Sequence, residues 1–182
     1  MSLTTTKWTV EDYHQMINAG ILEGRHVELI NGEIVEMSPE GSPHANKSTR
    51  AGEYLIRLLS NQAQVRSSKP ITLSDNSEPE PDLAIVQRLE EEYDRHHPYP
   101  ENIFWLIEYS NTSLAKDLET KTQVYARARI TEYWVVNLKE NKLIVFRDPI
   151  NDQYQFQQEL TDGNVTPLSF SNVAISVSKI LG

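Results

Sequence analysis

Two short, almost entirely apolar runs constrain the fold most strongly: DLAIV at residues 82–86 and IFWLIEY at 103–109. Runs of this kind are typical of strands that are buried on both faces of a sheet. The segments EYWVVN at 132–137 and KLIVFR at 142–147 have the same character. A sheet with two buried faces needs other elements packed on each side, so the chain must also supply helices.

Helical patterns occur in three places. The first begins at Thr9, a plausible N-cap with Asp12 three positions later, as in a capping box. Two longer patterns cover residues 44–63 and 113–129, and the latter lies between two of the apolar runs. We therefore predict an α/β or α+β fold, with a mixed sheet flanked by helices, in a single domain over residues 1–182.

The sequence also indicates local structure outside the main strands. The pair Asn31-Gly32 between two apolar-rich runs predicts a hairpin with a two-residue turn, which pairs Glu28 with Val35. Residues 65–68 and 71–73 resemble two further strands. The charged, proline-bearing segment 88–101 is expected to be an exposed excursion.

Composition excludes several classes of function. The chain has no cysteine, which rules out disulfides, thiolate catalysis and thiolate zinc sites. Its net charge of −9 argues against broad, nonspecific coating of nucleic acid, which requires a basic surface. A nuclease is still allowed, because metal-binding carboxylates also contribute negative charge. No secretory leader and no apolar stretch of about 18 residues are present, so a cytoplasmic protein without a membrane span is expected.

Two acids interrupt the apolar runs near their ends. Asp82 follows Pro81 and begins one run, and Glu108 lies near the end of another. If the two strands are neighbours, both carboxylates reach one edge of the sheet, where they repel each other unless a cation lies between them. A hard divalent ion with oxygen ligands meets that need. The alternative is that both acids are strand-end charges that face water.

Lys121 lies on the helix that follows the Glu108 strand, in a stripe with Asp117 and Tyr125 at intervals of four residues. A crossover helix packs back over the sheet, so Lys121 could reach the carboxylates. There it could orient a hydrolytic water or stabilise negative charge on a phosphoryl oxygen. The alternative is a surface ion pair between Lys121 and Asp117.

Histidines offer weaker signals. His44 follows Gly41 and Pro43 at a helix start, where its imidazole could bind a metal, shuttle a proton or contact phosphate, or could simply cap the helix. The adjacent pair at residues 96–97 lies in a polar loop and receives no role. The sequence has no Gly-x-Ser-x-Gly elbow, no phosphate-binding glycine loop and no zinc-ligand spacing.

Four segments in order resemble a known family. They are ELINGEIVEMSPEGSPH, EPEPDLAIV, LIEYSNTSLAKDLETKTQVYA and EYWVVN. Together they look like the Uma family of restriction-endonuclease-like proteins, a branch of the PD-(D/E)XK nuclease superfamily. The resemblance extends over about residues 8–181. It implies a restriction-endonuclease-like core with one catalytic edge, often assembled as a homodimer.

The resemblance also assigns roles to residues. It makes Asp82 the acid of the Pro-Asp motif and Glu108 the second acid. The superfamily usually has a lysine two positions beyond that acid, where this chain has Ser110. The resemblance to the Uma branch implies that the lysine lies on the following helix, which matches Lys121 and leaves Lys116 as an alternative.

Glu28 and His44 match further characteristic positions of the branch. The resemblance implies that both line the same cleft, with Glu28 completing the ligand set or positioning water and His44 touching substrate. One departure concerns Arg129, where the family commonly has glycine before its Glu-Tyr-Trp strand. Because arginine is strained in the left-handed region, we expect the preceding helix to end in a different way.

The expected function is therefore Mg²⁺- or Mn²⁺-dependent hydrolysis of DNA phosphodiester bonds by Asp82, Glu108, Lys121 and Glu28. The alternative is a catalytically inactive nuclease-fold protein that binds nucleic acid or a protein partner without cleavage. A purely structural dimer is a third reading, and it predicts that the four side chains lie far apart.

Overall fold

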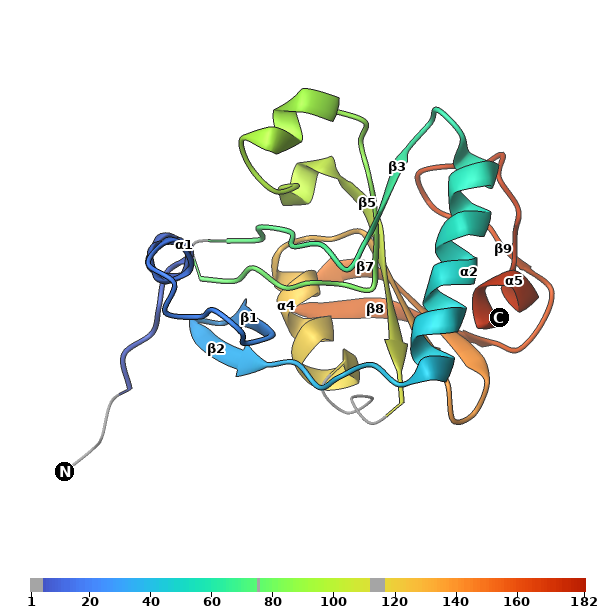
Figure 1. Cartoon of the computed structure of the whole chain (residues 1–182). Coiled ribbons are helices and arrows are strands. Elements are labelled where there is room, and N and C mark those ends of the chain that lie inside the picture. The colour runs from blue at the N-terminus through green and yellow to red at the C-terminus, as the bar shows by residue number, and fades with distance from the viewer. Residues whose placement is uncertain (1–4, 75, 112–116) are drawn as a thin grey trace.

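The computed structural model describes residues 5–74, 76–111 and 117–182, and a six-stranded sheet runs through its centre (Figure 1). The strands, in spatial order, are β3 Gln64–Ser67, β4 Leu83–Val86, β5 Ile103–Ser110, β6 Glu132–Asn137, β7 Lys142–Ile150 and β8 Gln153–Leu160. Strands β5 and β6 are parallel, and every other neighbouring pair is antiparallel. The predicted mixed sheet is confirmed.

The remaining elements surround this sheet. The helices are α1 Val10–Asn18, α2 Ser42–Leu59, α4 Thr122–Arg127 and α5 Val177–Leu181. Single-turn pieces are the 3₁₀ helices η1 Glu90–Asp94 and η2 Pro100–Asn102, and the π-helical turn η3 Asp117–Lys121. Two small hairpin sheets pair β1 Val27–Ile30 with β2 Glu33–Glu36, and β9 Asn164–Val165 with β10 Ile175–Ser176. Across the described residues, no helix has the length and apolar character that crossing a bilayer requires.

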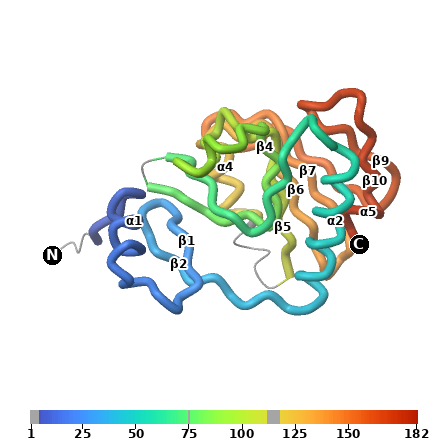
Figure 2. Tube along the Cα trace, turned by 45° about the horizontal axis from the view of Figure 1, so that its top comes forward, coloured from blue at the N-terminus to red at the C-terminus, as the bar shows by residue number. Residues whose placement is uncertain are grey.

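Both faces of the sheet are covered, which explains the uninterrupted apolar runs. In β6, Trp134 and Val136 pack into the cluster that contains the apolar residues of α2 and α5. The alternate residues Tyr133 and Val135 pack into the cluster that contains Val124 of α4. Figures 1 and 2 show α2 and α5 on one side of the sheet, with α4 and the β1–β2 hairpin on the other. The parallel pair β5–β6 requires a crossover connection, and α4 lies within it.

The N-terminal region follows its local sequence signals. Thr9 and Asp12 form a reciprocal capping box at the start of α1, as predicted. Asn31 and Gly32 adopt φ angles of 50° and 75°, which a type I′ turn requires. The predicted pairing of Glu28 with Val35 is confirmed. This register matters for the site, because it fixes which side chains of β1 point inward.

Two expectations about regular structure are wrong. Residues 71–73 do not form a strand, because their backbone closes a local turn: the amide of Ile71 donates to Pro79 O, and that of Leu73 donates to Ser77 O. The second helix begins two residues earlier than the predicted range 44–63 and ends at Leu59. His44 nevertheless lies in its first turn, as the sequence indicated.

The end of α4 also differs from expectation. Arg129 adopts a φ of 60°, so the helix does terminate in the left-handed region despite the side chain. The amide of Ile130 donates to Tyr125 O and that of Arg129 donates to Ala126 O, which together form a Schellman motif. The apolar contacts of Ile130 in the core hold this ending in place, so the strained conformation persists.

Candidate active site

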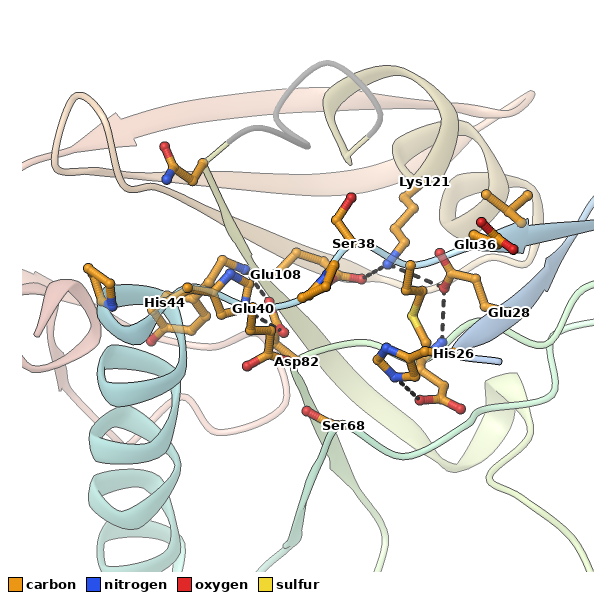
Figure 3. Close-up of a pocket in the computed structure, with 18 residues that line it drawn as sticks. His26, Glu28, Glu36, Ser38, Glu40, His44, Ser68, Asp82, Glu108 and Lys121 are labelled. Carbon is orange, nitrogen blue, oxygen red and sulfur yellow. Dashed lines mark hydrogen bonds and ion pairs between the residues drawn. The ribbon is translucent and has the colours of Figure 1, made fainter. Parts of the chain in front are cut away.

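A cavity of about 510 Å³ opens beside the start of β4 and the end of β5. The loop between β2 and α2 covers part of it, as Figure 3 shows. The five site residues predicted from the sequence all line this cavity: Glu28, His44, Asp82, Glu108 and Lys121. They come from β1, α2, the residue before β4, β5 and the end of η3, so only the folded chain brings them together.

Strand register brings the two predicted metal-binding acids to one edge. Strands β4 and β5 are antiparallel, with Leu83 opposite Ile107. Asp82 precedes Leu83 and Glu108 follows Ile107. If this register is continued by one residue, Asp82 lies opposite Glu108. Glu108 is 4% exposed, and the Asp82 side chain is 11% exposed. The reading of these acids as solvated strand-end charges is therefore wrong.

Both carboxylate oxygens of Asp82 have defined partners. Oδ2 accepts a hydrogen bond of 2.6 Å from the backbone amide of Tyr109, which ties the acid to β5. Oδ1 lies 2.9 Å from Nε2 of His44. Burial alone would lower the pKa of His44, but the hydrogen bond to Asp82 and the negative charges of Asp82, Glu40 and Glu108 outweigh it and raise that pKa above its ordinary value.

Glu108 is held by two residues of the crossover segment. Its Oε1 accepts hydrogen bonds from Lys121 Nζ at 2.7 Å and from the Tyr125 hydroxyl at 2.8 Å. The stripe inferred from the spacing of Lys121 and Tyr125 therefore faces the site. Lys121 is only 5% exposed, so it is not part of a surface ion pair. The side chain of Asp117, and Lys116 as the alternative lysine, lie outside the described residues.

Glu28 completes the buried charged group. It is 1% exposed, and its Oε2 lies 3.5 Å from Lys121 Nζ and accepts a 3.1 Å hydrogen bond from the amide of Glu80. Figure 3 shows the Lys121 ammonium between Glu108 and Glu28. Burial is the main reason that the pKa of Glu80 is raised, and the charge of Glu28 raises it further. Among the described residues that line it, the cavity is therefore rich in carboxylates around the buried Lys121 ammonium.

Sequence reasoning missed two members of the site. Glu40 lies in the loop before α2, and its ligand atom is within 4.8 Å of those of His44 and Asp82. Nothing in the local sequence of that loop distinguishes Glu40 from a solvated acid, so only the fold reveals it. Tyr125 carried a signal, because it shares the stripe of Lys121, but its hydroxyl contact with Glu108 could not be read from spacing alone.

The donor atoms suit a hard cation better than a soft one. Carboxylate oxygens of Glu28, Glu40, Asp82 and Glu108 line the cavity, and the imidazole of His44 lies 2.9 Å from Asp82. Oxygen-rich sets of this kind favour Mg²⁺, Mn²⁺ or Ca²⁺. Among the described residues, the group that brings three potential ligand atoms together at this cavity is Glu40, His44 and Asp82.

Comparisons with known proteins agree with this fold. The chain is similar to a solved structure described as "a putative nuclease belonging to DUF820" from Anabaena variabilis, with a TM-score of 0.66 and 18% sequence identity. The alignment covers 85% of this chain and 89% of that one. A search of curated proteins finds no significant match. A family model matches residues 10–178, almost the whole chain. The protein therefore belongs to the Uma2 family, whose description is "Putative restriction endonuclease".

Proposed function

We propose that the protein is a metal-dependent endonuclease that hydrolyses DNA phosphodiester bonds in the cytoplasm, with the cavity around Asp82 and Glu108 as its active site. One observation carries the proposal: Asp82 before β4, the buried Glu108 of β5 and the buried Lys121 of the crossover segment line one cavity. Membership of a family whose description is "Putative restriction endonuclease" supports the same reaction class.

The residues present fit a divalent cation. Burying several carboxylates costs free energy unless positive charge or hydrogen bonds compensate. The Lys121 ammonium pairs with Glu28 and Glu108, and Asp82 hydrogen-bonds His44. Among the described residues that line the cavity, carboxylates outnumber ammonium groups. Asp82 and Glu108 would hold Mg²⁺ or Mn²⁺, with Glu28 completing the ligand set or positioning water.

The remaining residues have roles that follow from their contacts. When bound, the divalent ion polarises the phosphate and lowers the pKa of an attacking water. The Lys121 ammonium pairs with Glu108 and Glu28, and in the reaction it would orient the water or stabilise charge on the phosphoryl oxygen. His44 hydrogen-bonds Asp82 and lines the open cavity, so it can contact the substrate phosphate.

Cleavage of plasmid DNA tests this function. With Mg²⁺, we expect the wild-type chain to nick supercoiled plasmid, and Asp82→Ala and Glu108→Ala to lower the rate by about 100-fold or more. The matched control is Glu53→Ala on α2, which removes one exposed carboxylate that does not line the cavity. Equal cutting by wild type, Asp82→Ala and Glu108→Ala would contradict the assignment.

A second candidate is a nuclease-fold protein that binds nucleic acid or a protein partner without cutting. The observation in its favour is the ion pair between Lys121 and Glu108, which already provides Glu108 with a cation. The net charge of −9 also disfavours tight binding of DNA. Calorimetric titration with Mg²⁺ and Mn²⁺ separates the two candidates: no site tighter than about 1 mM favours the non-cleaving protein.

We also propose that the protein acts as a homodimer. In the order of the central sheet, β8 is the outermost strand on one side, and it exposes Phe156. Outer strands of this kind can pair with another chain. Light scattering coupled to size-exclusion chromatography measures the mass directly, and a monomeric mass at micromolar concentration would contradict this proposal.

A further inference from the structure

A second group of potential metal ligands lies outside the active-site cavity. His14 belongs to α1, Glu78 to the loop before β4, and His97 to the excursion between β4 and β5. Their ligand atoms all lie within 4.8 Å of one another. Nε2 of His14 is 2.7 Å from Glu78 Oε1, and Nε2 of His97 is 4.0 Å from the same oxygen. None of the three lines the cavity that contains Asp82.

Glu78 is fixed in position before any ligand binds. It is 2% exposed, and its backbone pairs with that of Leu29 in an isolated bridge. Its Oε2 accepts a 2.6 Å hydrogen bond from the hydroxyl of Thr72. The other oxygen, Oε1, faces the two imidazoles. An outer hydrogen bond that orients a ligating carboxylate in this way is a regular feature of metal sites.

The chemistry of the group differs from that of the active site. Two imidazole nitrogens and one carboxylate oxygen suit a borderline cation such as Zn²⁺, and hard Mg²⁺ prefers oxygen ligands. Zinc sites with three protein ligands leave a fourth position to water or another ligand. Hollows of about 290 and 640 Å³ adjoin the group, the smaller lined by all three residues and the larger by both histidines.

We propose that His14, Glu78 and His97 form a second metal site, which binds Zn²⁺ or a transition-metal cation of similar chemistry. Tetrahedral zinc with bonds near 2 Å separates its ligand atoms by roughly 3.3 Å, so the two histidines need only small movements. The side chains of His14 and His97 are 45% and 34% exposed, which leaves them room to make these movements.

The metal would join three segments that are distant in sequence. It would tie α1 and the excursion 88–101 to the loop that carries Glu78, and so stabilise the N-terminal region against the core. The site rests on its own geometry and does not require that the protein cleave DNA.

The experiment measures Zn²⁺ binding by calorimetry in the full chain carrying Asp82→Asn and Glu108→Gln. This background weakens the carboxylate site, so failure of the nuclease proposal would not affect the result. We expect one Zn²⁺ per chain with micromolar affinity, and at least a tenfold loss of affinity in the additional variant His97→Gln. The matched control, His26→Gln, removes an imidazole outside the group and should bind Zn²⁺ unchanged.

Two further readouts distinguish binding from a folding defect. Zn²⁺ should raise the melting temperature of the background protein and of the His26→Gln control, but not that of His97→Gln. Co²⁺ used as a probe should give visible absorption bands that disappear in His97→Gln. If His97→Gln binds Zn²⁺ as tightly as the His26→Gln control, or if neither binds it, the proposal is overturned.

Discussion

Lys121 donates a 2.7 Å hydrogen bond to Glu108 Oε1, and the same ammonium lies 3.5 Å from Glu28 Oε2. Three buried, charged side chains therefore meet between the sheet and the crossover segment. A buried group of this kind is costly unless its charges are balanced. The relationship links the stability of the protein to the charge of its site.

Removing the ammonium tests that link. We expect Lys121→Met to lower the free energy of unfolding by about 3 kcal/mol without metal, because two buried carboxylates lose their cation. Mg²⁺ should restore more stability to this variant than to wild type, since the ion replaces the lost charge. Chemical denaturation with and without Mg²⁺ measures both effects. Arg57→Met, in an exposed pair on α2, should change little, and an equal loss in both variants would contradict the account.

The hydroxyl of Tyr125 provides a finer probe of Glu108. Tyr125→Phe removes the 2.8 Å hydrogen bond to Oε1 and keeps the ring, which packs edge to face against Tyr133. We expect a loss of about 1.5 kcal/mol in unfolding free energy, the usual scale for a hydrogen bond to a charged group. Thermal and denaturant unfolding measure this loss. The control is Tyr99→Phe at an exposed position, which should cost less; the reverse order would count against the account.

The left-handed end of α4 predicts a stabilising substitution. Arg129 adopts a φ of 60°, where a side chain is strained, and it is exposed to solvent. We expect Arg129→Gly to raise the free energy of unfolding by about 1 kcal/mol, because glycine adopts this conformation without strain. Arg129→Ala keeps the Cβ and serves as the control. A gain in Arg129→Ala equal to that in Arg129→Gly would show that loss of the arginine side chain, and not its backbone strain, is responsible.

Glu132 is a buried acid outside the cavity, and its substitution provides a comparison with the buried charged residues of the site. Glu132 is fully buried, and its Oε1 accepts hydrogen bonds from Trp134 and from two nitrogens of Arg147. We expect Glu132→Ala to cost about 3 kcal/mol, because the Arg147 guanidinium loses its carboxylate partner. Mg²⁺ should not restore this stability, in contrast to Lys121→Met. Denaturation with and without the ion checks the contrast, and recovery by Mg²⁺ would contradict a purely structural role.

Much of the fold could be predicted because local signals agreed with the final structure. The run 132–137 is buried on both faces and forms β6 with the predicted bounds. The Asn31-Gly32 turn fixed the register that points Glu28 inward. The prediction of a strand at residues 71–73 was wrong. Its apolar residues reach the core from a local turn, and their backbone does not pair with a strand of the sheet. Periodicity reports burial, and it does not report which backbone groups pair.

The site was predictable to the extent that its residues lie on regular elements. Asp82, Glu108 and Lys121 come from strand ends and a helical stripe, where spacing restricts direction. The positions of Glu40 and of the group His14, Glu78 and His97 depend on loops that the tertiary fold brings together. No local sequence pattern therefore predicts them. At Arg129 the sequence-based expectation was wrong for a different reason: tertiary contacts imposed a backbone conformation that arginine disfavours.

The most direct test of the central claim is to locate Mn²⁺ by its anomalous scattering in crystals of the wild-type chain. The account predicts one Mn²⁺ in the cavity, bonded to carboxylate oxygens of both Asp82 and Glu108 at about 2.2 Å, with the Lys121 ammonium displaced from Glu108. Binding by Glu40, His44 and Asp82 without Glu108, or a cavity that stays free of Mn²⁺ at millimolar concentration, would contradict it.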